Sequence, residues 1–212
     1  MEIVVNDTNI LIDLYNCGLL SHCNKLNIEF RTLDFVIEEI KEDDQLSAIK
    51  DIIKDGTLKV KSLTGEQIYK VAELMGQYNG TCNLSVVDIS VMLYAKENDF
   101  RLLTGDKTLR EKATLENVTV SGILYLIDLF CSQKVINNKD MITTLQTLIS
   151  SNSRLPHRLI RDRIEKIEKA EELMGKLKKT PNEETLQAMR DAEEGKNLGK
   201  VGKAEDLMKL LE

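Results

Sequence analysis

Four acidic residues in this sequence have the type and spacing needed to hold a divalent cation. Asp7 directly follows a β-branched run, and Asp106 follows a Leu-rich run, as expected after buried parallel strands. Glu39 and Asp88 lie in segments with helical spacing. Because the carboxyl ends of parallel strands are where ligands bind in an open α/β sheet, we expect the four carboxylates to converge there. Converging like charges are costly unless a cation neutralises them.

An acidic pocket of this kind suits the hydrolysis of a phosphodiester. That reaction needs charge stabilised on the non-bridging oxygens and an activated water, and a carboxylate-bound Mg²⁺ or Mn²⁺ can provide both. The predicted cofactor is therefore Mg²⁺ or Mn²⁺, and Asp7, Glu39, Asp88 and Asp106 supply the oxygen ligands that it needs.

Simpler roles remain open for single members of this set. Asp7 could serve only as the cap of a helix that begins near Asn9, and Asp106 could be only a turn residue. Glu38 competes with Glu39, but the two point in different directions on a helix, and Glu39 is preferred. Asp88 stands among apolar residues, which favours a buried, metal-neutralised acid.

Alternating strand and helix patterns predict an α/β fold with a mostly parallel sheet. The predicted strands are residues 2–6, 28–32, 58–60, 100–103 and 118–120. The predicted helices are 9–15, 34–41, 45–54, 64–75, 85–96, a short basic one from 106, 121–131 and 139–149. Capping is predicted at Asp34, at Thr64 with Gln67, and at Ser85.

Composition narrows the class of protein. With 212 residues the chain can form one α/β domain and an appendage. A formal charge of −6 argues against a strong non-specific nucleic-acid binder, and 4% aromatic residues argue against base-stacking platforms. The four cysteines lack CxxC spacing, so zinc is not expected. Without a signal peptide or an apolar run of about 18 residues, we expect a cytoplasmic protein with no membrane span.

Four motifs in order resemble those of PIN-domain nucleases, including the VapC-like toxins of toxin–antitoxin pairs. They are Asn6-Asp7-Thr8-Asn9, Glu39-Ile40, Leu84-Ser85-x-x-Asp88 and Leu103-Thr104-Gly105-Asp106-x-x-Leu109-Arg110. The resemblance covers residues 1–166 and implies a three-layer α/β/α nuclease domain with an RNA substrate. Carried over by position, it implies that Asp7, Asp88 and Asp106 are catalytic metal ligands, with Glu39 completing the set by direct or water-mediated contact. It also implies that Thr8 and Thr104 orient the carboxylates by hydrogen bonds.

Basic residues follow the last acidic motif. Lys107 and Arg110, with Lys112, could grip substrate phosphate beside the pocket. The alternative is an ordinary solvated helix face.

Past Pro156 the sequence becomes a charged helical tail. Residues 157–179 read as one long helix, and residues 167–212 are predicted as a separate helical segment. Residues 178–212 resemble the toxin-binding half of RelB/DinJ-type antitoxins. This implies that the tail restrains the nuclease, in cis or within a homo-oligomer. Alternatives are a tail that packs as ordinary helices, or a catalytically silent PIN-fold interaction protein of a toxin–antitoxin system.

Overall fold

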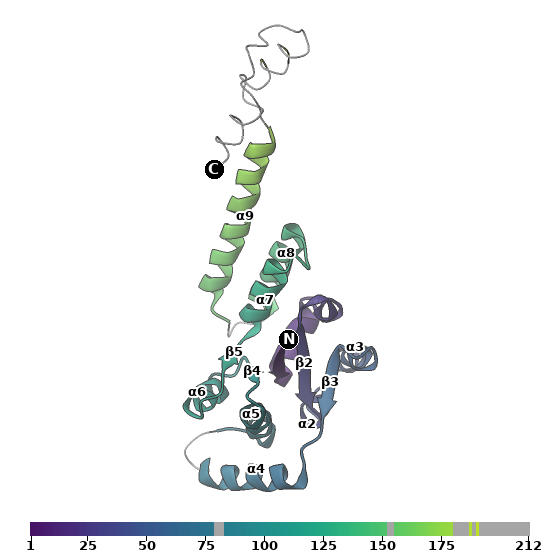
Figure 1. Cartoon of the computed structure of the whole chain (residues 1–212), viewed down its shortest axis with the longest axis vertical. Helices are drawn as coiled ribbons and strands as arrows, with labels where there is room; N and C mark the ends of the chain where they lie inside the picture. Colours follow the sequence, from purple (N-terminus) through teal and green to yellow (C-terminus); the bar gives the residue numbers. More distant parts are fainter. Residues whose placement is uncertain (79–82, 152–154, 180–186, 188–189, 191–212) are drawn as a thin grey trace, which may run out of the picture. The chain divides into compact units, whose positions relative to one another are not determined.

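The computed structural model describes residues 1–78, 83–151, 155–179, 187 and 190, and strands and helices alternate through most of this length (Figure 1). The elements in order are β1 (Glu2–Asn6), α1 (Thr8–Asn16), the 3-10 helix η1 (Leu20–Lys25), β2 (Ile28–Leu33), α2 (Asp34–Glu38), α3 (Asp43–Lys54), β3 (Leu58–Lys61), α4 (Gly65–Tyr78), α5 (Val86–Asn98), β4 (Arg101–Leu103), α6 (Lys107–Leu115), β5 (Val120–Ser121), α7 (Ile123–Ser132), α8 (Asn138–Ser151) and α9 (His157–Lys179).

The strands of the described chain form one five-stranded sheet in the order β3-β2-β1-β4-β5, with every neighbouring pair parallel. Val4 and Val5 of β1 and Leu102 and Leu103 of β4 are fully buried. Such apolar runs are typical of parallel strands covered on both faces. The predicted α/β fold with a mostly parallel sheet is confirmed.

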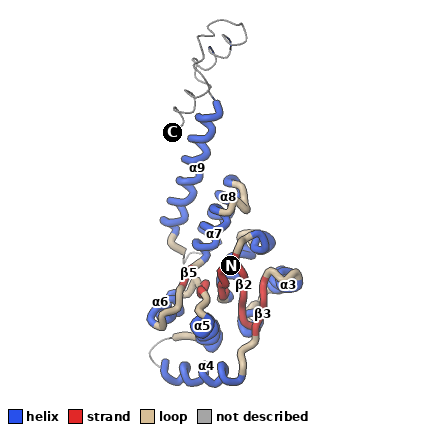
Figure 2. The backbone as a smooth tube through the Cα atoms, viewed as in Figure 1, coloured by secondary structure: helices blue, strands red, loops and turns tan. Residues whose placement is uncertain are grey.

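Helices cover both faces of this sheet, as Figure 2 shows. Because parallel crossovers are right-handed, the path β1-β2-β3 and the path β3-β4-β5, which run in opposite directions, place their helices on opposite faces. Accordingly, α1 packs against α3, α7 and α8, whereas α5 packs against β1, β2 and β4 and against its neighbours α4 and α6. The architecture is the expected three-layer α/β/α arrangement.

The strand order reverses between β1 and β4, where Asn6 is in register with Leu103. A crevice opens at such a switch point outside the carboxyl ends of the strands, and ligands of open α/β sheets bind there. The chain leaves β1 at Asp7 and leaves β4 at Thr104. The topology therefore brings two of the sequence motifs together at the centre of the sheet edge.

Several helix ends differ from the sequence prediction by a few residues. The helix expected at 34–41 ends at Glu38, so Glu39 is its C-cap residue, and its N-cap is Leu33 rather than Asp34. The last strand is Val120–Ser121 rather than 118–120. The capping pairs were correct: Thr64 and Gln67 exchange backbone–side-chain hydrogen bonds before α4, and Ser85 caps α5.

The chain divides into two units, Met1–Glu165 and Lys166–Glu212. In the first unit, Ile160 of α9 is fully buried and Arg163 pairs with Asp128 of α7 at 2.6 Å. In the second, Leu173 and Met174 of α9 are exposed. The antitoxin-like segment 178–212 lies almost entirely outside the described residues, so its role stays a prediction. No described helix, the 23-residue α9 included, is apolar enough over its length to cross a membrane.

Candidate functional site

Asp7 stands at the switch point, immediately after β1. Its backbone N–H donates to the Leu103 carbonyl of β4 (3.0 Å), which extends the strand pairing by one residue. Its carboxylate accepts from the backbone N–H of Thr8 (2.7 Å), from the hydroxyl of Thr104 (2.8 Å) and from the Asn9 amide (3.4 Å). The residue is only 2% exposed. The central carboxylate of the site is therefore buried and held by protein donors.

Burial raises the pKa of Asp7 to about 6, because the ionised form loses its hydration. The negative charge of Asp88 raises this pKa further, whereas the hydrogen bonds from Thr104, Thr8 and Asn9 lower it. Asp7 is consequently an acid that stays ionised near neutral pH only at an energetic cost. A bound cation would remove that cost.

Thr104 connects the ends of β1 and β4. Its hydroxyl donates to Asp7 and accepts from the backbone N–H of Asp106 (3.0 Å). Asp106 in turn caps α6 by accepting from the N–H of Leu109 (2.7 Å). One hydroxyl group thus fixes the relative position of two of the four predicted acids.

Thr8 makes the corresponding connection to Glu39. Its hydroxyl donates to Glu39 Oε2 at 2.6 Å, across from α1 to the C-cap of α2. Glu39 is exposed. Early termination of α2 at Glu38 brings the Glu39 side chain to Thr8, a placement that the helix expected over 34–41 would not have specified.

Asp88 lies in the first turn of α5 and is half-buried rather than buried as expected. Its carboxylate accepts from the Ser85 backbone N–H (2.8 Å), while the Ser85 hydroxyl accepts from the Asp88 N–H (3.0 Å). This reciprocal capping box holds the carboxylate at the amino end of the helix. Its charge nonetheless acts on Asp7, so the two acids lie near each other.

Capping and site formation therefore coincide. Asp7 caps α1, Asp106 caps α6 and Asp88 belongs to the capping box of α5. A helix amino terminus stabilises negative charge. The capping roles that the sequence offered as alternatives to a metal site are real. They also fix these carboxylates at one edge of the sheet.

A metal would have to be held with the help of water. Among the residues that the structure describes, no three His, Cys, Asp or Glu side chains meet closely enough to form a ligand set by themselves. Mg²⁺ usually keeps several waters and takes one or two carboxylates directly. The oxygen-only donors and the mutual repulsion of Asp7 and Asp88 fit such a cation. Asp106 and Glu39, tied in through Thr104 and Thr8, fit ligation through water.

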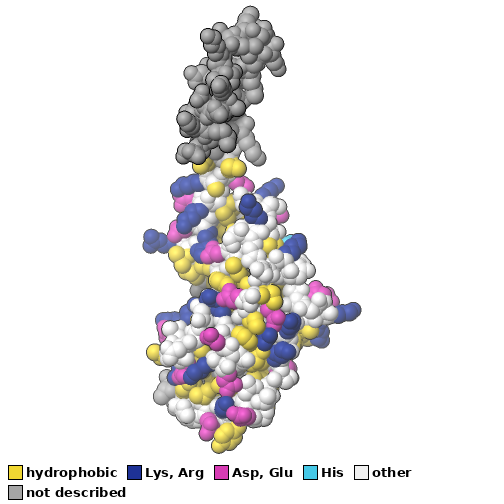
Figure 3. Space-filling model, in the orientation of Figure 1, with side chains coloured by type: hydrophobic (Ala, Val, Ile, Leu, Met, Phe, Trp, Pro, Cys, Tyr) yellow, Lys and Arg dark blue, Asp and Glu magenta, His cyan; other side chains and the backbone are white. Residues whose placement is uncertain are grey.

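The two predicted substrate-binding cations differ in their surroundings. Lys107 is 87% exposed at its side chain and makes a loose pair with Glu111 (3.7 Å). Arg110 is half-buried, and its Nη2 donates to the Thr104 carbonyl (2.8 Å). Basic and acidic side chains are interspersed on the face seen in Figure 3. Among the described residues drawn on that face, Lys and Arg do not gather into one broad patch for a polyanion.

Asn6 and Asn9, the two asparagines of the first motif, have no role that the sequence predicts. Asn9 donates to the Asp7 carboxylate. Asn6 is fully buried; its amide donates to the Arg31 carbonyl (3.0 Å), and its Oδ1 has no partner in the described residues. Gly122 leaves the space that the Arg110 guanidinium fills. A polar residue closing an apolar strand was the available signal for Asn6. Gly122 stands in the segment Gly122-Ile123-Leu124 that contributes to the family resemblance, but the sequence assigned it no role.

Comparisons with known proteins place the chain in a family. Similar solved structures include VapBC2 from Rickettsia felis bound to a promoter DNA fragment (16% identity, covering 57% of this chain and 98% of that chain, TM-score 0.42). A PilT N-terminus domain protein from Sulfolobus solfataricus (16%, 62% and 92%, 0.38) and FitAcB from Neisseria gonorrhoeae (9%, 57% and 99%, 0.37) are also similar. No curated protein sequence matches. A PIN-domain family model matches residues 3–169, and the chain therefore belongs to the PIN-domain family.

Proposed function

We propose that this protein is a metal-dependent endoribonuclease of the PIN-domain toxin type. PIN domains are typically metal-dependent nucleases, and this chain belongs to that family. The observation that carries the proposal is Asp7: a buried carboxylate at the switch point of the sheet, with a raised pKa and the like charge of Asp88 beside it. A permanently ionised group in that position is favoured only with a cation present.

The proposed roles follow from the contacts. Asp7 and Asp88 hold Mg²⁺ or Mn²⁺ directly, and Asp106 and Glu39 orient its waters. The bound cation supplies charge stabilisation for the phosphodiester and an acidified water. The Thr104 hydroxyl holds the carboxylate of Asp7 (2.8 Å), and the Thr8 hydroxyl holds that of Glu39 (2.6 Å). Thr104 also accepts from the backbone N–H of Asp106 (3.0 Å). Exposed Lys107 is placed at the start of α6 to meet substrate phosphate.

The test is cleavage of labelled RNA by the full chain in Mg²⁺ or Mn²⁺ and in chelator. Cleavage should require metal and should be lost in Asp7→Asn and Asp88→Asn. Asp51→Asn, an exposed acid on α3, is the matched control and should cleave like wild type. Chelator-resistant cleavage, or an Asp7→Asn protein as active as the control, would refute the proposal. A folded wild type that binds metal poorly and cleaves nothing would favour a catalytically silent interaction protein.

We further propose that the tail restrains this activity. The support is the resemblance of residues 178–212 to a toxin-binding antitoxin segment and its apolar positions Leu207, Leu210 and Leu211. A covalently linked segment acts at high effective concentration, so modest affinity is enough for inhibition. Deleting residues 168–212 should raise specific activity, and a peptide of residues 178–212 should lower it again. Unchanged activity of a folded truncated protein would contradict restraint.

A further inference from the structure

Arg110 reaches back from the first turns of α6 to the end of β4. Its Nη2 donates to the Thr104 carbonyl at 2.8 Å, and its own backbone N–H bonds the Asp106 carbonyl. The half-buried guanidinium therefore spans the loop that carries Asp106. Of the predicted phosphate contacts, Arg110 is the one already engaged with the protein backbone.

Gly122, at the start of α7, provides the room for this contact. A Cβ atom at Gly122 would lie 2.8 Å from Arg110 Nη2 and 3.5 Å from the Thr104 carbonyl oxygen. The backbone there is extended (φ −125°, ψ −169°), a conformation open to any residue. Glycine is thus needed for space rather than for backbone freedom, and alanine would displace the guanidinium while leaving its charge in the protein.

The residue that Arg110 holds is the one that orders the acids. Thr104 pairs with β5 through its N–H (3.0 Å to the Ser121 carbonyl), and its hydroxyl bonds both Asp7 and Asp106. With the Arg110 bond, both backbone polar groups and the hydroxyl of Thr104 are engaged. Rotation of this residue would move two carboxylates at once.

We infer that Arg110 is a positioning residue of the acid site, which acts through Thr104 and depends on the space at Gly122. The inference rests on the proposed metal-dependent function. Arg110 sets the geometry with which Asp7 meets the cation and Asp106 meets the waters of the cation, and it does so without touching RNA. The bond to the Thr104 carbonyl uses one guanidinium N–H, so a grip on phosphate would be an additional role, which the KM for RNA tests.

The experiment is a double-mutant cycle in the full chain with Arg110→Ala, Gly122→Ala and the double variant. The readouts are the Mn²⁺ dissociation constant by titration and the backbone amide resonance of Asp106, whose N–H bonds the Thr104 hydroxyl. Each single variant should weaken Mn²⁺ binding about tenfold, the lower range for loss of an outer-shell partner. The double variant should also show about tenfold rather than a hundredfold weakening, because one contact is lost in all three.

Two variants make the result specific. Gly76→Ala, on α4 with nothing within 4 Å of the added Cβ, should bind Mn²⁺ like wild type. The lysine in Arg110→Lys can still donate one hydrogen bond to the Thr104 carbonyl, so this variant should bind Mn²⁺ more tightly than Arg110→Ala.

Three results would overturn the inference. Unchanged Mn²⁺ affinity and an unmoved Asp106 resonance in Arg110→Ala, with only a lower thermal midpoint, would make Arg110 a plain brace. A raised KM for RNA with a silent Gly122→Ala would make it a phosphate grip. Additive losses in the double variant would break the link to Gly122. If wild type binds Mn²⁺ without cleaving RNA, the proposed function fails, but the mutant cycle still tests whether Arg110 positions the acids. If wild type binds no Mn²⁺, the Asp106 resonance tests that role.

Discussion

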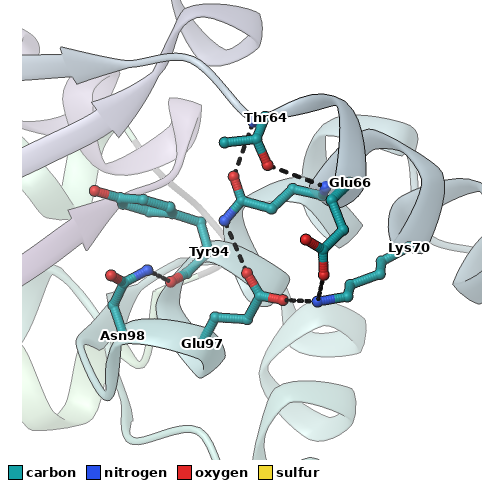
Figure 4. A network of polar contacts seen from close by, with 7 residues as sticks. Thr64, Glu66, Lys70, Tyr94, Glu97 and Asn98 are labelled. Carbon is teal, nitrogen blue, oxygen red and sulfur yellow. Dashed lines mark hydrogen bonds and ion pairs between the residues drawn. The ribbon is translucent and has the colours of Figure 1, made fainter.

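Carboxylates occupy two regions of this molecule in opposite settings. Between α4, α5 and α6, Glu97 accepts from Lys70 (2.9 Å; Figure 4) and from the side-chain amide of Gln67 (2.8 Å). Glu116 nearby bonds Lys96 at 2.8 Å and Lys112 at 3.1 Å. At the carboxyl edge of the sheet, Asp7 has only hydroxyl, amide and backbone donors, and within the described chain none of the four predicted acids forms an ion pair.

The pKa values follow these settings. Hydrogen bonds from Lys96 and Lys112 hold the pKa of Glu116 at about 2, and Lys70 lowers the pKa of Glu97. Burial raises the pKa of Asp7 to about 6. Glu97 and Glu116 are paired with lysines of the protein, whereas Asp7 has no cationic side chain bonded to it among the described residues and is ionised at neutral pH only at a cost. That difference, rather than the count of carboxylates, supports the site proposed at the carboxyl edge of the sheet.

The largest expected effect of the contrast is on catalysis. Asp7→Asn should lower RNA cleavage more than about a hundredfold, beyond what losing an outer-shell partner already costs. Glu97→Gln removes a carboxylate from the ion-paired region and should leave cleavage unchanged. Single-turnover rates in saturating Mn²⁺ measure both. Equal losses in the two variants would mean that the two regions do not differ in function.

A smaller loss is expected from the hydroxyl that orients the acids. Thr104→Val keeps the shape of the side chain but removes its bonds to Asp7 and Asp106. Cleavage should fall about 10- to 100-fold. Thr104→Ser retains the hydroxyl and should stay close to wild type. A serine variant as impaired as the valine variant would assign the effect to packing in this fully buried position.

The stability of metal-free protein should show the cost of ionising Asp7. A pKa raised from 3.8 to about 6 disfavours folding above pH 6 by about 3 kcal/mol at most. Asp7→Asn should therefore unfold at higher denaturant than wild type at pH 7 in chelator, by about 1–3 kcal/mol once lost hydrogen bonds are counted. The gain should shrink as pH falls from 6 to 4, because wild-type Asp7 then protonates. A gain that does not depend on pH would contradict this origin.

The sequence predicted much of this arrangement because its signals were local. Apolar runs located β1 and β4, and the pair Thr64 and Gln67 located the start of α4. The end of α2 was not predictable in this way, since residues 39–41 continue a helical pattern and only tertiary contacts, such as Thr8 with Glu39, reveal where the helix stops.

The neighbours of individual acids could not be predicted from the sequence in full, for a related reason. The sequence spacing indicates only Lys112, four residues before Glu116. It does not indicate that Lys96 of α5 also reaches Glu116, or that Thr104, which follows β4, bonds Asp7. Likewise, Gly122 and Arg110 are twelve positions apart, and only packing shows that one makes space for the other. Which acids are paired is a property of the fold rather than of any segment.

The smallest expected effect is in the ion-paired region. Glu116→Gln removes bonds to Lys96 and Lys112 and weakens one to Tyr78 (3.0 Å). Because the partners are partly exposed, the loss at pH 7 should be within about 1 kcal/mol. A lowered pKa stabilises the fold above pH 4.5, and this contribution disappears as pH falls toward 2. The destabilisation caused by Glu116→Gln should thus fade below pH 4.5. It should also fade in high salt, which screens charges at the surface. Urea unfolding of this variant and of Asp7→Asn across pH 3–8 would compare the two regions directly. At neutral pH, Glu116→Gln should lower the stability of the fold and Asp7→Asn should raise it. A change of the same sign in both variants would refute the contrast.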